Sequence, residues 1–547
     1  MKLVLSVLIL MLMMMQCTVK EADVLLKNGL IYTVDSAFTT VTGMVYRNGI
    51  ILETGKWEEL LEKYHPRIEF DLNGKCVYPG FIDAHSHFYG YGTFLAMADL
   101  TGASSFDEVI LRLKRHAKIY PGQWIVGRGW DQNHWPDKKF PVNTELDRLF
   151  PDKFVVLIRV DGHAVLVNSP VMHLAGFNAT TAISGGEILT ENGKVTGVVL
   201  DKGADRIREL IPELTAIEKR SAILKAQENC FKVGLTSVCE AGADGSLISL
   251  FDEMHRKGEL KMRIYAMLNP GEANEEQYMQ HGPYITDFLT VRSLKLYADG
   301  ALGSRGAALL EPYSDDPENS GIIVTNADAM RAVCARALTA GFQVNTHAIG
   351  DAANRQVLNV YREFLSEKND LRWRIEHAQT IHPDDLPLFG KYAIIPSIQT
   401  THCTSDMEWA GSRLGQRIEN AYIYKELLQQ NGWIPNGTDF PIEDIDPLKT
   451  FYSAVFRRNL AGWPAAGFQM ENALTREEAL RSVTIWAAKA GFDESRKGSL
   501  EPGKVADFVI LNQDILSVDE SAVLKTKVLA TFVNGDLMIK NSSFHWK

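Results

Sequence analysis

Pro79-Gly80-Phe81-Ile82-Asp83-Ala84-His85-Ser86-His87 is a turn that leads into a short apolar segment ending in two histidines. Alternate side chains of a β-strand point to the same face, so His85 and His87 can converge on one point. Neutral imidazoles at this spacing suit a borderline metal ion such as zinc. Two imidazoles alone make a poor metal site, and the competing interpretation is one packed and one solvent-exposed histidine. Further ligands elsewhere in the chain decide between the two.

Apolar segments of strand length recur along the middle of the chain, with helical patterns between them. Helices are expected, for example, at 326–340 and 351–367. The capping box Thr475-Arg476-Glu477-Glu478 predicts the start of a further helix near the end of the barrel. Eight alternating strands and helices predict an α/β fold, a (β/α)8 TIM barrel over residues 78–496. The strands are expected at Val77–Ala84, Leu235–Cys239, Met262–Met267, Ser293–Ala298, Gln343–Thr346, Arg372–Glu376, Ala393–Ser397 and Trp433–Gly437.

The two ends of the chain resemble each other in pattern. Short strands are expected in residues 22–77 and again at 505–533, and Asn-Gly pairs stand at 28–29, 48–49 and 534–535. Asn-Gly between apolar runs is a strong hairpin signal. We therefore expect residues 18–77 and 497–547 to pair into one small β-sandwich domain beside the barrel.

The interval between the first and second predicted strands is far longer than a crossover helix and two short loops require. It is rich in Trp, Pro and Gly, as in the segment Gly129–Pro136. Long insertions after a barrel strand fall at the C-terminal face, where active sites are built. Residues 91–220 are therefore predicted to form an insertion that acts as a substrate lid or wall.

The composition is that of an ordinary soluble globular protein of 547 residues, 46% hydrophobic and 23% charged. A net charge of −11 without a basic cluster argues against nucleic acid as a partner. Six cysteines without a CxxC motif do not make a disulfide framework, and Cys230 and Cys239 are expected in the core. We expect a small-molecule substrate, and a homo-oligomer is left open.

Residues 1–17 differ in kind from the rest of the chain. The apolar run from Leu3 to Met15 is too short to span a bilayer comfortably and is typical of a secretory signal peptide. Cys17 stands where a bacterial lipoprotein is cleaved and acylated, although Gln16 occupies a place where a small residue is usual. Simple cleavage near Cys17 is the alternative. Either way we expect an exported protein, periplasmic or held at the membrane by an N-terminal lipid anchor.

Residues of ligand type stand at the ends of later predicted strands. His347 follows the fifth, His377 the sixth and Asp439 the eighth. Each histidine taken singly is more often a core or surface residue than a ligand. Because the C-terminal ends of parallel barrel strands meet at one face, the set predicts a metal site there, together with His85 and His87.

This pattern resembles the amidohydrolase superfamily. The resemblance runs over nearly the whole mature chain. Four motifs resemble its family 3 branch: Gly129–Trp135, Asp161-Gly162-His163-Ala164, Ala298–Arg305 and Thr404-Ser405-Asp406-Met407. The tail Gly498-x4-Gly503-x2-Ala506-Asp507 is similar to the returning β segment of the superfamily. The resemblance implies a metal-dependent hydrolase in which His85, His87, Lys295, His347, His377 and Asp439 bind one or two divalent ions, with zinc the expected metal. It is unspecific for substrate, since the superfamily hydrolyses amides, esters and ring C–N bonds.

The position of Lys295 in its predicted strand indicates that its side chain is buried. With Leu294, Leu296 and Ala298 packed outward, a period of two turns Lys295 into the barrel interior, where an unpaired ammonium is costly. Burial favours the neutral amine, which is the form that adds CO2. The resemblance implies that the resulting carbamate bridges two metals. A plain lysine that pairs with an acidic residue or contacts substrate is the alternative.

The expected chemistry follows from these ligands. Asp439 is the predicted catalytic base, which takes a proton from the attacking water and returns it to a leaving amine. Four residues are candidates for substrate binding: His163, Arg305, His134 and His402. We expect hydrolysis of a non-peptide C–N bond, as in an N-acyl or N-formyl amine. A metal-dependent lyase, decarboxylase or esterase on the same scaffold is the alternative, and an exported binding protein without catalysis is the third interpretation.

Overall fold

The computed structural model describes residues 20–120, 122–159, 162, 164–183, 186–542 and 544. The predicted signal peptide, with Cys17, and His163 lie outside the described residues. The chain divides into two compact units, Met1–Phe88 with Gln227–Lys547, and Tyr89–Ala226. Within the described ranges, no helix combines the length and apolar character that crossing a bilayer requires.

The first unit contains a nearly closed parallel barrel of seven strands. They are β8 (Phe81–Ser86), β15 (Leu235–Ala243), β16 (Arg263–Leu268), β18 (Leu289–Tyr297), β19 (Gln343–Ala348), β20 (Arg374–His377) and β21 (Ile395–Ser397), hydrogen-bonded in this order. The short β17 (Tyr284–Ile285) pairs antiparallel with β18 at the side. The first seven predicted strands are thereby found, although the predicted Val77–Ala84 splits into β7 (Cys76–Pro79) and β8.

The predicted eighth strand, Trp433–Gly437, is not a regular strand. It makes one isolated bridge, between Ile398 and Asn436. Pro435 has no N–H for a ladder, and the N–H of Asn436 donates to Ser482 O at 3.0 Å, outside the sheet, so the segment lacks a continuous ladder. The segment still closes the barrel: Gly437 N–H donates to Ile398 O at 2.9 Å, and Asp439 N–H donates to His85 O at 2.8 Å.

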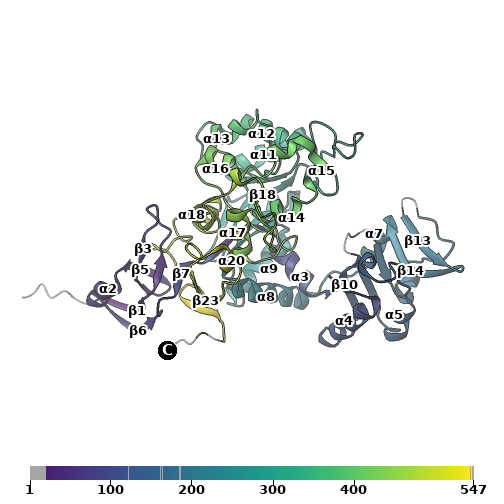
Figure 1. Ribbon diagram of the computed structural model, residues 1–547, viewed down its shortest axis with the longest axis horizontal. Helices are drawn as coiled ribbons and strands as arrows, with labels where there is room; N and C mark the ends of the chain where they lie inside the picture. Colours follow the sequence, from purple (N-terminus) through teal and green to yellow (C-terminus); the bar gives the residue numbers. More distant parts are fainter. Residues whose placement is uncertain are drawn as a thin grey trace, which may run out of the picture. The chain divides into compact units, whose positions relative to one another are not determined.

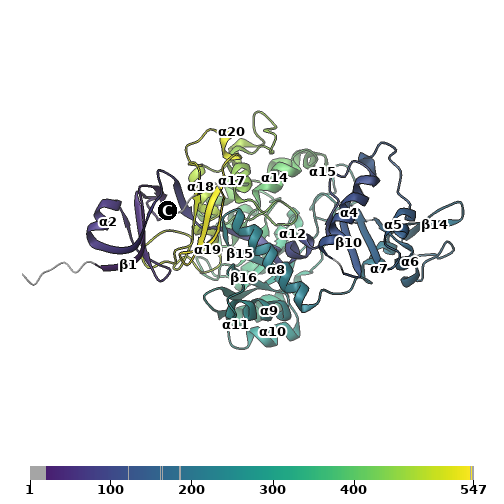
Figure 2. The same ribbon diagram turned by 90° about the horizontal axis from the view of Figure 1, so that it is seen from below.

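Helices between the strands lie outside the barrel (Figure 1, Figure 2). The predicted helices at 326–340 and 351–367 are α11 (Ala327–Ala340) and α12 (Asp351–Phe364), and the predicted capping box of Thr475 and Glu478 begins α18 (Arg476–Ser482). Further helices include α8 (Ala216–Lys232), α9 (Gly245–Arg256), α10 (Glu272–Met279), α13 (Leu386–Lys391), α14 (Thr400–Asp406), α15 (Ala410–Leu414), α16 (Tyr424–Asn431), α17 (Pro447–Phe456) and α19 (Ile485–Ala490).

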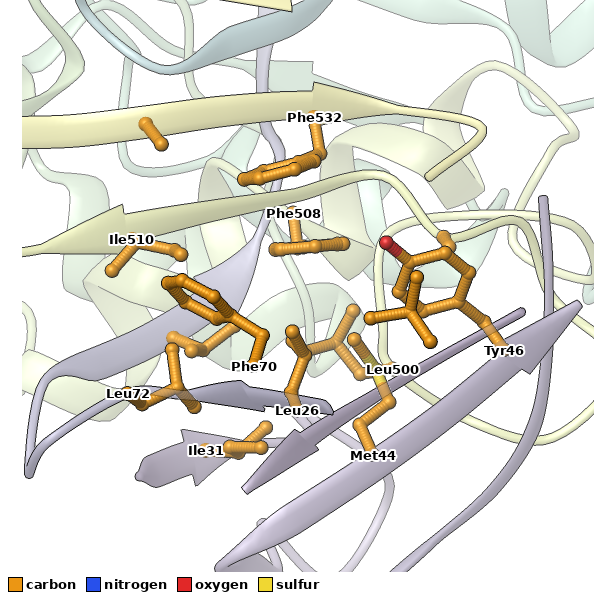
Figure 3. Close-up of a cluster of buried hydrophobic side chains, with 14 of the residues drawn as sticks. Leu26, Ile31, Met44, Tyr46, Phe70, Leu72, Leu500, Phe508, Ile510 and Phe532 are labelled. Atoms are coloured by element: carbon orange, nitrogen blue, oxygen red, sulfur yellow. The ribbon is translucent and has the colours of Figure 1, made fainter. Parts of the chain in front are cut away.

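Strands from both ends of the chain form two further sheets in the first unit. One sheet has the order β5 (Ile50–Gly55), β4 (Gly43–Arg47), β1 (Lys20–Lys27), β6 (Tyr64–Asp71). The other has the order β24 (Asp536–Lys540), β23 (Val528–Val533), β22 (Phe508–Leu511), β7, β2 (Leu30–Tyr32), β3 (Thr40–Val41). Figure 3 shows the shared core, in which Phe508 and Phe532 stack above Leu26 and Met44.

Two of the three Asn-Gly hairpin predictions are confirmed. Asn48-Gly49 joins the antiparallel pair β4 and β5, and Asn534-Gly535 joins β23 and β24, all four residues having φ between 50° and 75°. These are the angles that a two-residue hairpin turn requires. Asn28-Gly29 is different, because β1 and β2 belong to different sheets and the pair is a corner between them.

The second unit, Tyr89–Ala226, has a sheet and cores of its own. Its strands run in the order β13 (Gly186–Glu191), β14 (Lys194–Asp201), β12 (Ala164–Val167), β11 (Phe154–Arg159), β10 (Trp124–Trp130), β9 (Ala98–Asp99). Helices α4 (Phe106–Ile119), α5 (Thr144–Leu149), α6 (Ser169–Leu174) and α7 (Lys202–Arg208) accompany them. Trp130 and Trp135 are buried, and each indole donates to a backbone carbonyl within the unit. Part of the Trp-rich motif is therefore core of this unit, and its role as a lid stays a prediction.

Candidate metal centre

The two histidines of the first barrel strand share one face, as the period of two predicts. Their ring centroids lie 5.8 Å apart at the C-terminal end of β8. His85 is fully buried, and its Nδ1–H donates to Glu376 Oε2 at 2.6 Å. A carboxylate that accepts from one ring nitrogen fixes the tautomer, so the other nitrogen, Nε2, is left free to bind a metal. Burial lowers the pKa of His85 to about 4, which keeps the ring neutral.

Three of the predicted ligands converge closely. The ligand atoms of His85, His377 and Asp439 all lie within 4.8 Å of one another. His377 ends β20, and both His377 and Asp439 have left-handed backbone, with φ of 74° and 60°. Such conformations are costly for non-glycine residues and are often found at functional sites.

The donor atoms of this group fit a divalent cation. In the part of the chain that the structure describes, His377 Nδ1 and Asp439 Oδ1 are buried without a hydrogen-bond partner. Buried polar atoms are normally satisfied, and nitrogen and carboxylate oxygen are the donors that zinc prefers. Burial raises the pKa of Asp439, but contacts with His402 and His87 and the nearby rings of His85 and His377 hold it well below its usual range.

His87 and His347 stand beside this group. His87 Nε2 is 3.2 Å from Asp439 Oδ1, and the ring of His347 lies 4.5 Å from the ring of His377, centroid to centroid. His347 Nε2 faces Asp299 Oδ1 at 3.4 Å. The other ring nitrogen of His347, Nδ1, is therefore the one that remains for a metal ion. Asp299 also accepts the N–H of Gly350 at 2.8 Å and so holds the turn after β19.

Lys295 projects into the barrel, as its place in β18 predicts. It is only 1% exposed, and its Nζ lies 3.3 Å from His85 Nε2. Burial lowers the pKa of Lys295 to about 8, although the charges of Glu376 and Asp439 oppose the shift. The amine is therefore inside the centre and is neutral more readily than an exposed lysine.

Two positioning residues are absent from the sequence prediction. Glu376 orients His85, and Asp83 accepts the His85 N–H at 3.0 Å and the Thr438 hydroxyl at 2.6 Å. Asp83 thereby ties β8 to the segment that carries Asp439, and burial raises its pKa to about 7. The sequence signal for Asp83 is an acidic side chain inside an apolar strand, whereas Glu376 stands in the polar segment Arg374–His377 and has no such signal. At Gly437 a Cβ atom would lie 2.4 Å from His85 N, so this close approach requires glycine.

The predicted substrate-binding residues occupy different places. His402, in α14, faces Asp439 Oδ2 at 3.4 Å and Glu443 Oε1 at 3.3 Å. Burial alone lowers the pKa of His402, but the two carboxylates raise it to about 10. Arg305 binds Asp315 through Nε and Nη2, at 3.1 and 3.0 Å, so its carboxylate partner here belongs to the chain itself. The side chain of His134, like all of His163, lies outside the description.

The chain matches a family model and known proteins over most of its length. The model described as "Amidohydrolase family" matches residues 69–539. Protein LONG AFTER FAR-RED 3 of Arabidopsis thaliana is 33% identical, over 94% of this chain and 91% of that protein. N-substituted formamide deformylase of Arthrobacter pascens is 26% identical, over 94% of this chain and 98% of that enzyme.

A solved structure agrees with these sequence matches. An uncharacterized metal-dependent hydrolase from Pyrococcus furiosus superposes with a TM-score of 0.77 and 31% identity, over 90% of this chain and 100% of that one. Fold, family model and the convergence of His85, His377 and Asp439 point the same way. The chain therefore belongs to the amidohydrolase family, in its family 3 branch.

Proposed function

We propose that the protein is a metal-dependent hydrolase of a non-peptide C–N bond, in an N-acyl or N-formyl amine. The observation that carries the proposal is the meeting of His85, His377 and Asp439, with His377 Nδ1 buried and without a hydrogen-bond partner among the described residues. Family membership supports hydrolysis, and the relative named N-substituted formamide deformylase supports this substrate class.

His85, His377 and Asp439 would hold the first divalent ion, and His87, His347 and Lys295 are the further donors beside them. When bound, such an ion makes hydroxide available from water near neutral pH and polarises the scissile carbonyl; zinc is the proposed metal. Asp439 accepts the proton of the attacking water and delivers it to the leaving amine. Glu376 keeps the His85 tautomer correct throughout.

We further propose that Lys295 is carboxylated and belongs to a two-metal site. Its burial and lowered pKa favour the neutral amine that reacts with CO2. Reconstitution with bicarbonate should then raise the metal content, and Lys295→Met should lose at least one metal per chain. A wild-type protein with one metal, indifferent to bicarbonate, would leave Lys295 as an ordinary buried lysine beside His85.

The decisive experiment is a reconstitution followed by a substrate screen. Protein freed of metal by chelation is reloaded with Zn²⁺, Mn²⁺ or Co²⁺ and offered N-acyl amines, N-formyl amines, esters and carboxylated aromatic acids. We expect turnover of amides that chelation abolishes and that Asp439→Asn lowers by about 10²–10⁴-fold. Full turnover without metal would refute the proposed chemistry, whereas CO2 release from the aromatic acids would favour a decarboxylase.

We also propose that the protein is exported, on the evidence of residues 1–17 alone. If Cys17 is lipidated, Cys17→Ala should move the protein from the membrane fraction to the soluble fraction. If the signal peptide is simply cleaved, Cys17→Ala should not change how the protein is distributed between the membrane and soluble fractions. The mature chain would then be shortened by about as much as in a lipoprotein. A mature protein that retains Met1 would contradict both.

A further inference from the structure

His402 lies behind the proposed catalytic carboxylate. It is the third residue of α14, which begins directly after the seventh barrel strand, β21. Its two ring nitrogens face two carboxylates, Asp439 on one side and Glu443 on the other. The geometry points to His402 as a positioning residue that aims Asp439 and is itself anchored by Glu443. This inference rests on the proposed function, which gives Asp439 its task.

The three side chains form a chain of contacts that leads from the centre toward the surface. His402 Nε2 is 3.4 Å from Asp439 Oδ2, and His402 Nδ1 is 3.3 Å from Glu443 Oε1. The Ser405 hydroxyl also donates to Glu443 Oε1, at 2.6 Å. The exposed fractions are 12% for the His402 side chain and 21% for that of Glu443. Glu443 is therefore held by two residues of one helix, and His402 is fixed from behind.

Asp439 needs such a support. Its backbone is placed by the hydrogen bond from its N–H to His85 O at 2.8 Å, which does not determine the orientation of its carboxylate. The two carboxylate oxygens have different surroundings: Oδ2 faces His402, whereas Oδ1 lies 3.2 Å from His87 Nε2 and 3.6 Å from His85 Nε2, on the side of the proposed metal ligands. With Oδ2 engaged by His402, Oδ1 is the oxygen that remains for a metal.

The same contacts argue against His402 as a substrate-binding residue. Both ring nitrogens are directed at carboxylates of this chain, so neither is left for a hydrogen bond to substrate. Residues that orient a metal ligand are commonly worth about 10–100-fold in metal affinity or activity. A loss of that size in metal affinity or activity distinguishes a positioning residue from an ordinary buried histidine.

The test compares His402→Ala, His402→Gln and Glu443→Gln with the wild type. His382→Gln is the matched control, because His382 also faces a carboxylate, Asp384, but on the surface. Three quantities are measured for each protein: Co²⁺ affinity by chelator competition, with the visible spectrum of the bound ion; kcat and KM on the substrate found by the screen; and the thermal unfolding midpoint without metal.

We expect His402→Ala to lower Co²⁺ affinity or kcat by about 10–100-fold, with KM within about twofold. His402→Gln should recover part of the loss, because an amide N–H can still donate to Asp439, and Glu443→Gln should show a smaller loss of the same kind. His382→Gln should match the wild type. The visible spectrum of Co²⁺ should change in His402→Ala and return toward the wild-type form in His402→Gln.

Two results would overturn the inference. A raised KM with unchanged kcat and Co²⁺ affinity would make His402 a substrate contact. A lowered unfolding midpoint with normal Co²⁺ affinity, spectrum and kcat in the folded fraction would make it merely structural. A wild-type protein that binds no metal would instead refute the proposed function. The orientation of Asp439 in a crystal structure of His402→Ala would then decide the inference: a turned carboxylate supports it and an unmoved one refutes it.

Discussion

Buried charged residues lie at both ends of the barrel strands. At one end their polar atoms are satisfied by partners, and at the other end some are not. Near the N-terminal ends, Arg263 makes a two-pronged pair with Asp507 at 2.6 and 3.0 Å, and Lys497 contacts Ser237 at 3.0 Å and Asp493 at 3.1 Å. Among the described residues, no buried polar atom of these five side chains lacks a partner.

At the C-terminal ends, the centre around Asp439 leaves polar atoms unsatisfied. A saturated network has nothing left to offer a ligand, whereas an incomplete one costs stability and is ready to bind. The same barrel thus separates a stabilising face from a reactive face, as parallel barrels generally do. Variants at the two ends should therefore differ in whether they change the reaction or the stability.

The largest effect is expected for Asp439→Asn. The amide keeps the size of the side chain but cannot accept the proton, so turnover should fall by about 10²–10⁴-fold. The thermal midpoint of the metal-free protein should also fall, because the pKa of Asp439 is held below its usual range, so its charge stabilises the folded state, and His402 loses a charged partner. Steady-state kinetics and calorimetry check the two parts. Near-normal turnover would refute the catalytic role, and metal loss would show that ligation is the main role.

Arg263→Leu should act on stability and leave the reaction alone. Removing one partner of a buried pair strands the other, here Asp507, at a cost of about 3–5 kcal/mol in the free energy of unfolding. Denaturant unfolding measures the loss, and kcat of the folded protein should stay at the wild-type value. The double variant Arg263→Leu, Asp507→Leu should recover stability. A comparable fall in kcat would contradict the separation of the two faces.

Glu376→Gln should weaken the centre moderately. The amide has no negative charge with which to hold Nδ1–H of His85, so metal affinity or activity should fall by about 10–100-fold. Metal competition and kcat are the measurements, and Glu477→Gln is the control, because the Glu477 side chain in α18 is exposed and pairs with Arg481. Unchanged metal affinity and activity would mean that the 2.6 Å contact does not orient His85.

The smallest effect concerns pH and Asp493. Burial raises the pKa of this carboxyl, but Lys497 and Arg496 outweigh burial and lower it to about 2. A depressed folded-state pKa contributes stability that is present above the unfolded value of about 4 and is lost as pH falls through about 2. Asp493→Asn should therefore cost about 2 kcal/mol at pH 7 and much less near pH 2, which urea titrations at both pH values measure. A pH-independent difference would contradict the ion-pair explanation.

Much of the barrel was predictable because its signals are local. Apolar runs of strand length between helical patterns placed seven strands within a few residues of their observed positions. The eighth failed because Pro435 has no N–H to donate and the N–H of Asn436 donates to Ser482 instead of a neighbouring strand, which an apolar run by itself does not reveal. Asn28-Gly29 failed for a related reason: the pair specifies a tight turn, but the sheets that receive the two strands depend on distant parts of the chain.

The sequence by itself determined which side chains end the barrel strands and which way they face. Strand periodicity is a local property. It therefore predicts that His85, His87 and Lys295 face the barrel interior, without knowledge of their partners. Only the tertiary structure decided how these residues are held. The contact of Glu376 with His85 spans 291 positions, and that of His402 with Asp439 joins a helix to a loop beyond the seventh strand. The order and stagger of the strands and the position of the closing loop determine which distant residues meet. No local sequence pattern contains this information.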